Sequence, residues 1–294
     1  MKTGLVFLII GLILAGCAGP APVQSTQLAL GTSVEITVSD DDKPREVIRK
    51  AIDQAFAEIK RVENIFSRHI PESEISQINT SAGIHPVSVG EETIALLERS
   101  REFSELSNGA FDITVGPLLE LWGFSAQFKG NIPPQEKILE TLELVGYQQI
   151  NINKLENNVS FARPGMNLTM GGIGAGYAVD RAVAILQDAG IKNALVNAGG
   201  DIYALGRRNK DSRWRVAVQN PREKNAILTV LELENQAVTT SGDYQRYFEA
   251  NGTRFSHIIN PKTGYPCSNI PASVTVLAGD CTTADALATA LFVL

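Results

Sequence analysis

The sequence predicts an α+β protein in which mixed sheets pack against helices. Residues 27–39 contain Val34, Ile36 and Val38 in alternation with Glu35 and Thr37, a pattern typical of a half-buried strand. Residues 47–62 instead repeat apolar side chains every three or four positions, which is typical of an amphipathic helix. Around residues 251–252, two strand-like runs meet at an Asn-Gly pair, the preferred turn of a tight β-hairpin.

The first half of the chain is predicted to hold three helices. The first follows an acidic turn at residues 40–44, whose carboxylates lie at the positive end of the helix dipole. A loop rich in side-chain donors covers residues 66–79. The second helix spans residues 91–107 and ends at Asn108-Gly109, a left-handed C-cap. The other expected elements are a short strand entering a turn at 111–117, a helix at 135–145, and strands at 149–152 and 159–162.

The second half begins with a glycine-rich loop, residues 171–176, that runs into a helix ending near residue 190. A buried strand at 194–197 leads to a second glycine turn with a carboxylate. Further strands reach residue 240, and the hairpin and another strand follow. The last segment, residues 282–294, is a helix without a cap, so we expect the natural protein to continue further.

The N-terminus has the pattern of an export signal. Lys2 precedes an apolar run at residues 5–15 that is too short for an ordinary membrane span. The run ends in Leu-Ala-Gly-Cys at residues 14–17, which resembles the lipobox of bacterial lipoproteins. An uncleaved anchor or an ordinary secretory signal is the alternative interpretation.

The lipobox resemblance divides the chain into three parts. It implies a lipoprotein signal peptide over residues 1–16, an acylated Cys17 in a tether over residues 17–26, and one globular domain over residues 27–294. The mature protein would be exported and held by acyl chains on a bacterial membrane, facing the periplasm or the cell exterior.

Composition and charge exclude nucleic acid as a partner. The formal net charge is -6, and Lys and Arg are scattered rather than gathered in a basic stripe. Aromatic residues make up only 6%, which argues against a base-stacking platform. Cys267 and Cys281 could pair in an oxidising compartment, but their spacing does not fit a metal site, so we expect structural or free thiols.

The glycine loop at residues 171–176 opens a helix and is therefore a natural seat for an anion. Its backbone amides can approach a phosphate, and the helix dipole favours negative charge there. A dinucleotide fingerprint does not fit, because Tyr177 occupies the third glycine position. Close packing of the helix on a sheet is the alternative reason for the glycines.

Three further residues have the chemistry of a catalytic site. Asp285 and Thr289 are four apart on the last helix, so they share a face that could hold a hard cation such as Mg²⁺. The alternative is an aspartate that only stabilises the start of the helix. His257 is either a core histidine bonded to backbone or a general base near neutral pH.

Taken together, these motifs resemble one family, the FAD:protein FMN transferases of the ApbE type. The resemblance extends from Leu30 over nearly the whole chain, in the order of the family's motifs. It implies an ApbE-like flavin-transferase fold and a Mg²⁺-dependent enzyme that cleaves FAD, transfers FMN to a threonine or serine hydroxyl of an acceptor protein, and releases AMP. The matching segments are residues 109–117, 171–180, 197–201, 241–244, 256–266 and 284–290.

The resemblance also assigns the site. The metal ligands would be the backbone carbonyl of Gly172 and the side chains of Asp285 and Thr289. His257 would deprotonate the acceptor hydroxyl, with Asp243 as an alternative base or orienter. Ala175 stands where the family often carries Lys or Glu, which removes a charge contact to the cofactor. The flavin contacts would fall at Leu30, Ala110, Phe111, Asp112, Ala175, Ser241 and Ile258.

The implied partners are FAD and exported redox proteins, such as subunits of membrane redox complexes, that become covalently flavinylated. Two alternatives stay open. A Mg²⁺-dependent FAD pyrophosphatase would use water in place of the acceptor hydroxyl. A flavin-binding lipoprotein without catalysis would need neither the metal ligands Asp285 and Thr289 nor the base His257, so these residues argue against it.

Overall fold

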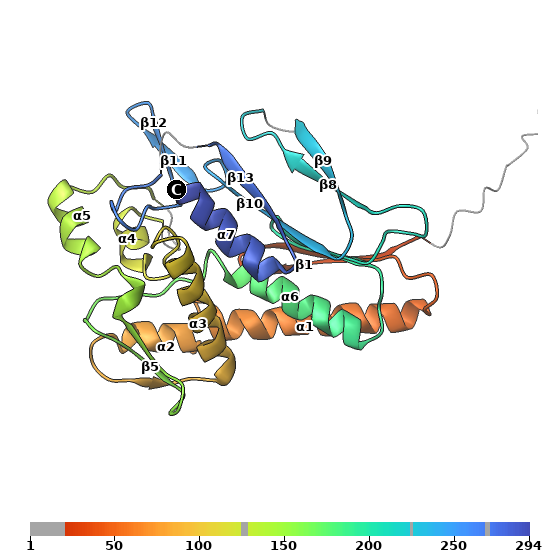
Figure 1. The fold of residues 1–294 in the computed structure, drawn as a ribbon, viewed down its shortest axis with the longest axis horizontal. Coiled ribbons are helices and arrows are strands. Elements are labelled where there is room, and N and C mark those ends of the chain that lie inside the picture. The colour runs from red at the N-terminus through yellow and green to blue at the C-terminus, as the bar shows by residue number, and fades with distance from the viewer. Residues whose placement is uncertain (1–20, 125–128, 224–225, 268–270) are drawn as a thin grey trace, which may run out of the picture.

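A computed structural model describes residues 21–124, 129–223, 226–267 and 271–294, so the predictions for the signal peptide and for Cys17 lie outside it. The described residues form an α+β fold, as predicted, with one six-stranded sheet, three smaller sheets and seven α-helices (Figure 1). No helix in these ranges is long and apolar enough to cross a membrane.

The six-stranded sheet is antiparallel throughout and supports the site. Its strand order is β1-β2-β6-β7-β10-β13. Alternation along β2 places Val34, Ile36 and Val38 in the core at 1% exposure or less, as the sequence pattern predicted. The strands are β1 (Val23–Ala29), β2 (Thr32–Val38), β6 (Ala194–Ala198), β7 (Asp201–Leu205), β10 (Gln236–Gly242) and β13 (Ser273–Ala278).

Two sequence boundaries near the N-terminus were wrong. Residues 23–26, predicted as tether, belong to β1, because they pair in register with residues 35–38 of β2. Residues 27–39, predicted as one strand, contain a turn at Leu30 and Gly31, which have φ of 56° and 71°. The strand therefore folds back on itself as a hairpin, and the globular domain begins before residue 27.

Three helices cover one face of the sheet: α1 (Arg45–Phe66), α6 (Gly174–Asp188) and α7 (Cys281–Val293). They lie side by side in Figure 1, with α6 between α1 and α7. Alanines are frequent on the buried faces of α6 and α7, and their small side chains permit close approach of the two helices.

The helices and strands of residues 74–161 form a smaller region beside α1. A three-stranded sheet of order β3-β5-β4 lies there with four helices and a 3₁₀ turn. The elements are α2 (Glu74–Thr80), β3 (Val87–Ser88), α3 (Glu91–Leu106), α4 (Gly116–Leu121), α5 (Gln135–Leu142), η1 (Tyr147–Gln149), β4 (Ile150–Asn153) and β5 (Asn158–Phe161).

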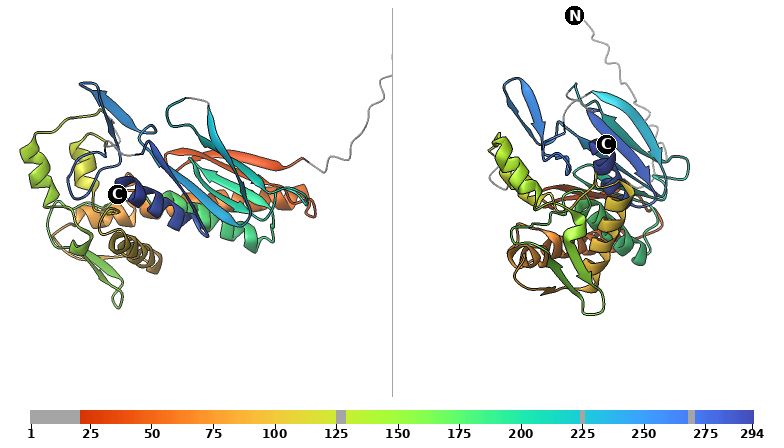
Figure 2. Two further views of the ribbon diagram at one scale, coloured as in Figure 1. Left: turned by 45° about the horizontal axis from the view of Figure 1, so that its top comes forward. Right: turned by 60° about the vertical axis from the view of Figure 1, so that its left-hand side comes forward.

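Two further ribbons project on the same side of the molecule (Figures 1 and 2). They are β8 (Trp214–Gln219) with β9 (Ile227–Leu233), and β11 (Tyr247–Ala250) with β12 (Thr253–Ser256). The second ribbon is the predicted hairpin, because Asn251 and Gly252 have φ of 52° and 74°.

The structure corrects two predictions in the first half. Residues 111–117 do not form a strand, because the Asp112 carboxylate accepts hydrogen bonds from the Thr114 amide and from the Tyr147 amide. These side-chain contacts hold a turn that leads into α4. The predicted loop at residues 66–79 contains α2, whose first turn is capped by the Ser73 hydroxyl accepting from the Ser76 amide at 3.0 Å.

Candidate functional site

The three predicted metal ligands meet where the loop before α6 reaches α7. Gly172 lies against Thr289: a Cβ added at Gly172 would be 3.0 Å from the Thr289 Oγ1. Asp285, one turn earlier on α7, is 5% exposed. Its Oδ2 accepts a hydrogen bond of 3.2 Å from the Gly176 amide. The glycine loop and the last helix therefore come together, as the family resemblance implied.

The donor set at this junction fits a hard divalent cation. Burial, reinforced by the charge of Asp201, raises the pKa of Asp285 well above its usual range. A cation beside this carboxylate would replace the hydration that burial removes. The described ranges contain no group of three His, Cys, Asp or Glu side chains arranged for a metal. A cation here would therefore rely on one carboxylate, one hydroxyl and the Gly172 carbonyl.

Several predicted flavin contacts surround the second half of α7. The Ser241 hydroxyl, at the end of β10, lies 3.5 Å from the Thr289 hydroxyl. A Cβ at Gly172 would be 3.3 Å from the Phe111 ring, so this ring borders the glycine loop. Ala110 and Ile258 are buried in one cluster with the last residues of α7. These residues give the proposed cation site an apolar border.

The other three flavin predictions lie in different surroundings. The Leu30 amide donates to the Glu63 carboxylate of α1 at 2.9 Å. The Asp112 carboxylate is committed to the turn described above, and burial raises its pKa. Ala175 occupies the first turn of α6 and is half-buried.

His257 is held in the form that a general base requires. Its Nδ1 lies 3.1 Å from the carbonyl oxygen of Arg246, and its backbone amide donates to the same carbonyl at 3.0 Å. Because a carbonyl only accepts, the proton is on Nδ1 and the lone pair is on Nε2. Burial lowers the pKa of His257 to about 4, so the ring is neutral at pH 7. The predicted backbone contact of His257 is therefore present, and its role as a base stays a prediction.

Asp243 is engaged by two arginines. Arg222, in the loop between β8 and β9, donates to both carboxylate oxygens at 2.7 and 2.8 Å. Arg254 of β12 approaches Oδ1 at 3.8 Å. Because the Arg222 guanidinium binds both carboxylate oxygens of Asp243, the geometry favours the orienting role over the basic one. No motif in the sequence pointed to Arg222, which is 21 residues away from Asp243.

Two further carboxylates at this junction escaped the sequence prediction of the site. Asp201 follows the second glycine turn, and burial raises its pKa to about 6. The negative charge of Asp201 also raises the pKa of Asp285. Asp180, on α6, accepts hydrogen bonds from the backbone amides of Cys281 and Thr282 at the start of α7. Asp180 and Asp201 are the last residues of two glycine-containing segments that match the family, residues 171–180 and 197–201. Their place in these segments could have marked them as candidate site residues.

The two described thiols lie beside the site as unpaired side chains, and the charges of Asp201, Asp180 and Asp285 add to burial in raising the pKa of Cys281. Cys267 and Cys281 are both buried and free, as the sequence predicted. Burial raises the pKa of Cys267 to about 12, so this thiol is protonated and unreactive at neutral pH.

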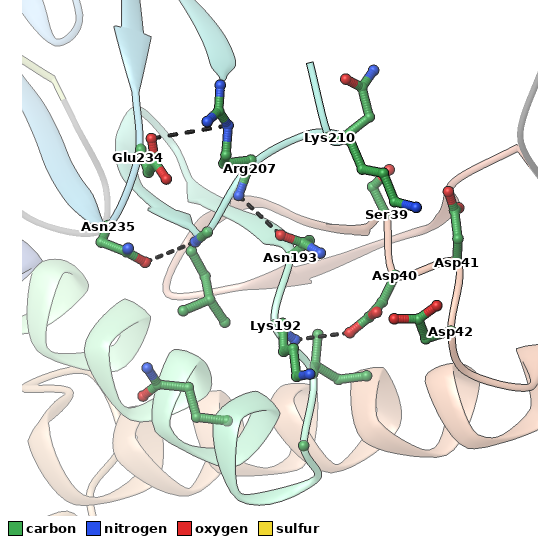
Figure 3. A pocket seen from close by; sticks show the side chains of 16 residues that line it. Ser39, Asp40, Asp41, Asp42, Lys192, Asn193, Arg207, Lys210, Glu234 and Asn235 are labelled. Carbon is green, nitrogen blue, oxygen red and sulfur yellow. Dashed lines mark hydrogen bonds and ion pairs between the residues drawn. The ribbon is translucent and has the colours of Figure 1, made fainter. Parts of the chain in front are cut away.

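A cavity of about 720 Å³ lies away from these residues, around the C-terminal end of α6 (Figure 3). Its polar groups largely bind one another: Asp40 accepts from the Lys192 amide at 2.8 Å, and the Asn193 side chain accepts from the Arg207 amide at 2.9 Å. None of the predicted site residues lines this cavity. Volume alone therefore does not locate the chemistry of this chain.

Comparison with known proteins identifies the chain's relatives. The ApbE family model matches residues 30–294. The chain is 33% identical over 299 residues to the FAD:protein FMN transferase of Vibrio cholerae, with all of this chain and 88% of that protein covered. It is also 33% identical to the enzyme of the same name from Treponema pallidum, again over its full length and 87% of that protein. The crystal structure of the ApbE protein from Thermotoga maritima superposes with a TM-score of 0.86 at 38% identity, covering 92% of this chain and 86% of that one. The chain is therefore a member of the ApbE family.

Proposed function

We infer that this protein transfers FMN from FAD to a hydroxyl of an acceptor protein and releases AMP. The observation that carries this function is the junction of Gly172, Asp285 and Thr289 on the glycine loop and α7. Relatives that match the whole chain at 33% identity are named FAD:protein FMN transferase. The function accounts for a buried carboxylate at the point where two helices meet.

The proposed reaction is a phosphoryl-type transfer. The acceptor threonine or serine oxygen attacks the phosphorus on the FMN side of the FAD diphosphate. A new P–O bond forms, and the P–O bond to the adenylate breaks, so that AMP leaves with the bonding electron pair. His257 would take the hydroxyl proton on Nε2, because Nδ1 already bears a proton directed at the Arg246 carbonyl.

We propose Mg²⁺ as the cofactor held by the Gly172 carbonyl and by the side chains of Asp285 and Thr289. When bound, the ion would neutralise charge on the diphosphate and act as a Lewis acid. The mixed oxygen set supports this assignment, because Mg²⁺ prefers oxygen ligands and keeps positions for water or substrate phosphate. Among the three ligands, only Asp285 would bring a negative charge, and its buried position would strengthen its interaction with a cation.

We also propose that the flavin binds beside this cation site. Ser241, Phe111, Ala110 and Ile258 border the cation site and support a flavin seat there. Leu30, Asp112 and Ala175 would complete it from more distant elements. Asp243, held by Arg222, would orient the loop that precedes the β11–β12 hairpin.

The decisive experiment is incubation of the purified protein with FAD, Mg²⁺ and a threonine-containing acceptor domain from a membrane redox complex. AMP release and in-gel flavin fluorescence are followed together, with an Asp285→Ala variant and EDTA as controls. Fluorescence on the acceptor band that both controls remove supports the transferase. AMP release without a fluorescent acceptor favours the pyrophosphatase. Bound FAD with neither signal favours a flavin carrier.

We propose that the protein is exported and anchored by acyl chains on Cys17, where it would modify exported redox proteins. The support is the apolar run at residues 5–15 followed by the lipobox-like residues 14–17. Cell fractionation after labelling with a fatty acid tests this. Label and membrane association that a Cys17→Ala variant loses would support the anchor, and unlabelled protein would exclude it.

A further inference from the structure

Asp180 connects the two helices that carry the proposed metal site. It lies in the second turn of α6, and its carboxylate is directed at the N-terminus of α7. Oδ1 accepts from the Cys281 amide at 2.7 Å. Oδ2 accepts from the Thr282 amide at 2.8 Å and from the Thr282 hydroxyl at 2.5 Å. Three hydrogen bonds therefore tie one side chain of α6 to the first turn of α7.

This contact is separate from the ordinary cap of α7. The N-cap residue is Asp280, whose side chain accepts from the Thr283 amide at 2.7 Å and from the Thr283 hydroxyl at 2.8 Å. Asp180 accepts hydrogen bonds from the amides of Cys281 and Thr282, the first two residues of α7. These amides have no partner within the helix, and Asp280 does not bind them. The start of α7 is thus bound by two carboxylates, and Asp180 is the one that belongs to another helix.

A second contact lies one turn earlier on the same face of α6. Gly176 precedes Asp180 by four residues, and its amide donates to the Asp285 carboxylate at 3.2 Å. A Cβ at Gly176 would be 2.4 Å from the Cys281 carbonyl oxygen, so the two backbones are in direct contact. Any slip of α7 along α6 would therefore move Asp285 relative to Gly172.

We propose that Asp180 is a positioning residue that fixes α7 on α6 and thereby sets the distance between Gly172 and the ligands Asp285 and Thr289. The proposal rests on the proposed function, because it takes these three residues as the metal site. It assigns Asp180 no contact with FAD or with the reacting atoms. Removing the groups that orient metal ligands typically weakens metal binding by about 10- to 100-fold.

The test compares Asp180→Ala with Asp280→Ala. Each variant removes a carboxylate that binds amides at the same end of α7, but only the first cuts a link to α6. Binding of Mn²⁺ to the protein without FAD is measured from the electron paramagnetic resonance of the free ion, alongside the melting temperature. We expect both variants to melt earlier, with Mn²⁺ binding weakened at least about tenfold in Asp180→Ala and less than about threefold in Asp280→Ala.

Equal weakening of Mn²⁺ binding in the two variants would overturn the proposal, since Asp180 would then act only as a helix cap. Asp180→Asn keeps the size of the side chain and one acceptor, so it serves where the alanine variant does not fold. Its Mn²⁺ affinity is expected between wild type and Asp180→Ala, and a wild-type value would again overturn the proposal. A wild-type protein that binds Mn²⁺ but releases no AMP from FAD would refute the proposed function and leave the role of Asp180 standing.

Discussion

Gly176 offers a direct test of the contact between α6 and α7. Alanine at this position would place its Cβ 2.4 Å from the Cys281 carbonyl oxygen and 2.9 Å from the Asp285 Cβ. Real Cβ atoms essentially never approach another heavy atom closer than 3.0 Å, so the first contact is 0.6 Å too short. Both opposing atoms belong to the backbone or to the base of a side chain. No rotamer change can relieve the overlap, and the helices must separate.

The two opposing energies give the size of the effect on stability. Overpacking of this kind costs about 1–3 kcal/mol, and alanine returns up to about 1 kcal/mol through its better helix propensity. We therefore expect Gly176→Ala to lower the free energy of unfolding by up to about 3 kcal/mol, which leaves a typical domain folded. The displacement also moves Asp285 away from Gly172, and errors of about 1 Å in a catalytic site can cost about 100-fold in rate.

The assay pairs urea unfolding with Mg²⁺-dependent release of AMP from FAD. We expect the rate to fall at least about tenfold while the folded fraction at assay conditions stays near one. Gly279→Ala is the matched control, because a Cβ there meets no atom within 4 Å although it lies two residues before α7. A Gly176→Ala variant with wild-type stability and rate would refute the close helix contact.

Three further predictions concern the proposed base His257 and the ion pair of Arg222 with Asp243. His257→Ala should lower FMN transfer by about 10²- to 10⁴-fold while FAD still binds, and a collapse of FAD affinity would reassign the residue to binding. Because burial lowers the pKa of His257 to about 4, the unprotonated ring persists as pH falls through 6.5, and kcat/KM should decline only as pH approaches 4. An acid limb centred near 6.5 would contradict that environment. Arg222→Ala and Asp243→Ala should lower transfer by similar factors and be non-additive in the double variant, whereas additive losses would show that the pair does not act as a unit.

The sequence predicted correctly those elements whose conformation depends on neighbouring residues in the chain. The alternation of residues 34–38 and the Asn251-Gly252 turn each specify a conformation without reference to distant residues. The predictions were wrong where the conformation depends on contacts with residues farther along the chain. Residues 23–26 become a strand through β2, and residues 111–117 become a turn through hydrogen bonds that include Tyr147, 35 residues from Asp112.

The residues of the candidate site also fall into those that local sequence predicts and those that it does not. A spacing of four residues was enough to place Asp285 and Thr289 on one helix face, and the family resemblance added Gly172. The ion pair of Asp243 with Arg222 could not be predicted, because two ribbon loops bring it together and neither loop has a periodic pattern. The role of Asp180 depends on how α6 crosses α7, which a single sequence does not specify.

The raised pKa values of Asp201 and Asp285 imply that the metal-free site lowers the stability of the fold. A carboxyl whose folded pKa is raised binds more protons in the folded than in the unfolded protein, so stability decreases as pH rises from about 4 through the folded pKa. Asp285→Asn keeps the shape and an acceptor for the Gly176 amide but carries no charge. Without metal at pH 8, this variant should therefore melt at a higher temperature than wild type, and the difference should shrink towards pH 4. Added Mg²⁺ should raise the melting temperature of wild type alone, because only the carboxylate gains from binding. A variant that melts earlier than wild type at pH 8 without metal would mean that the protein itself, rather than a cation, compensates the charge of Asp285.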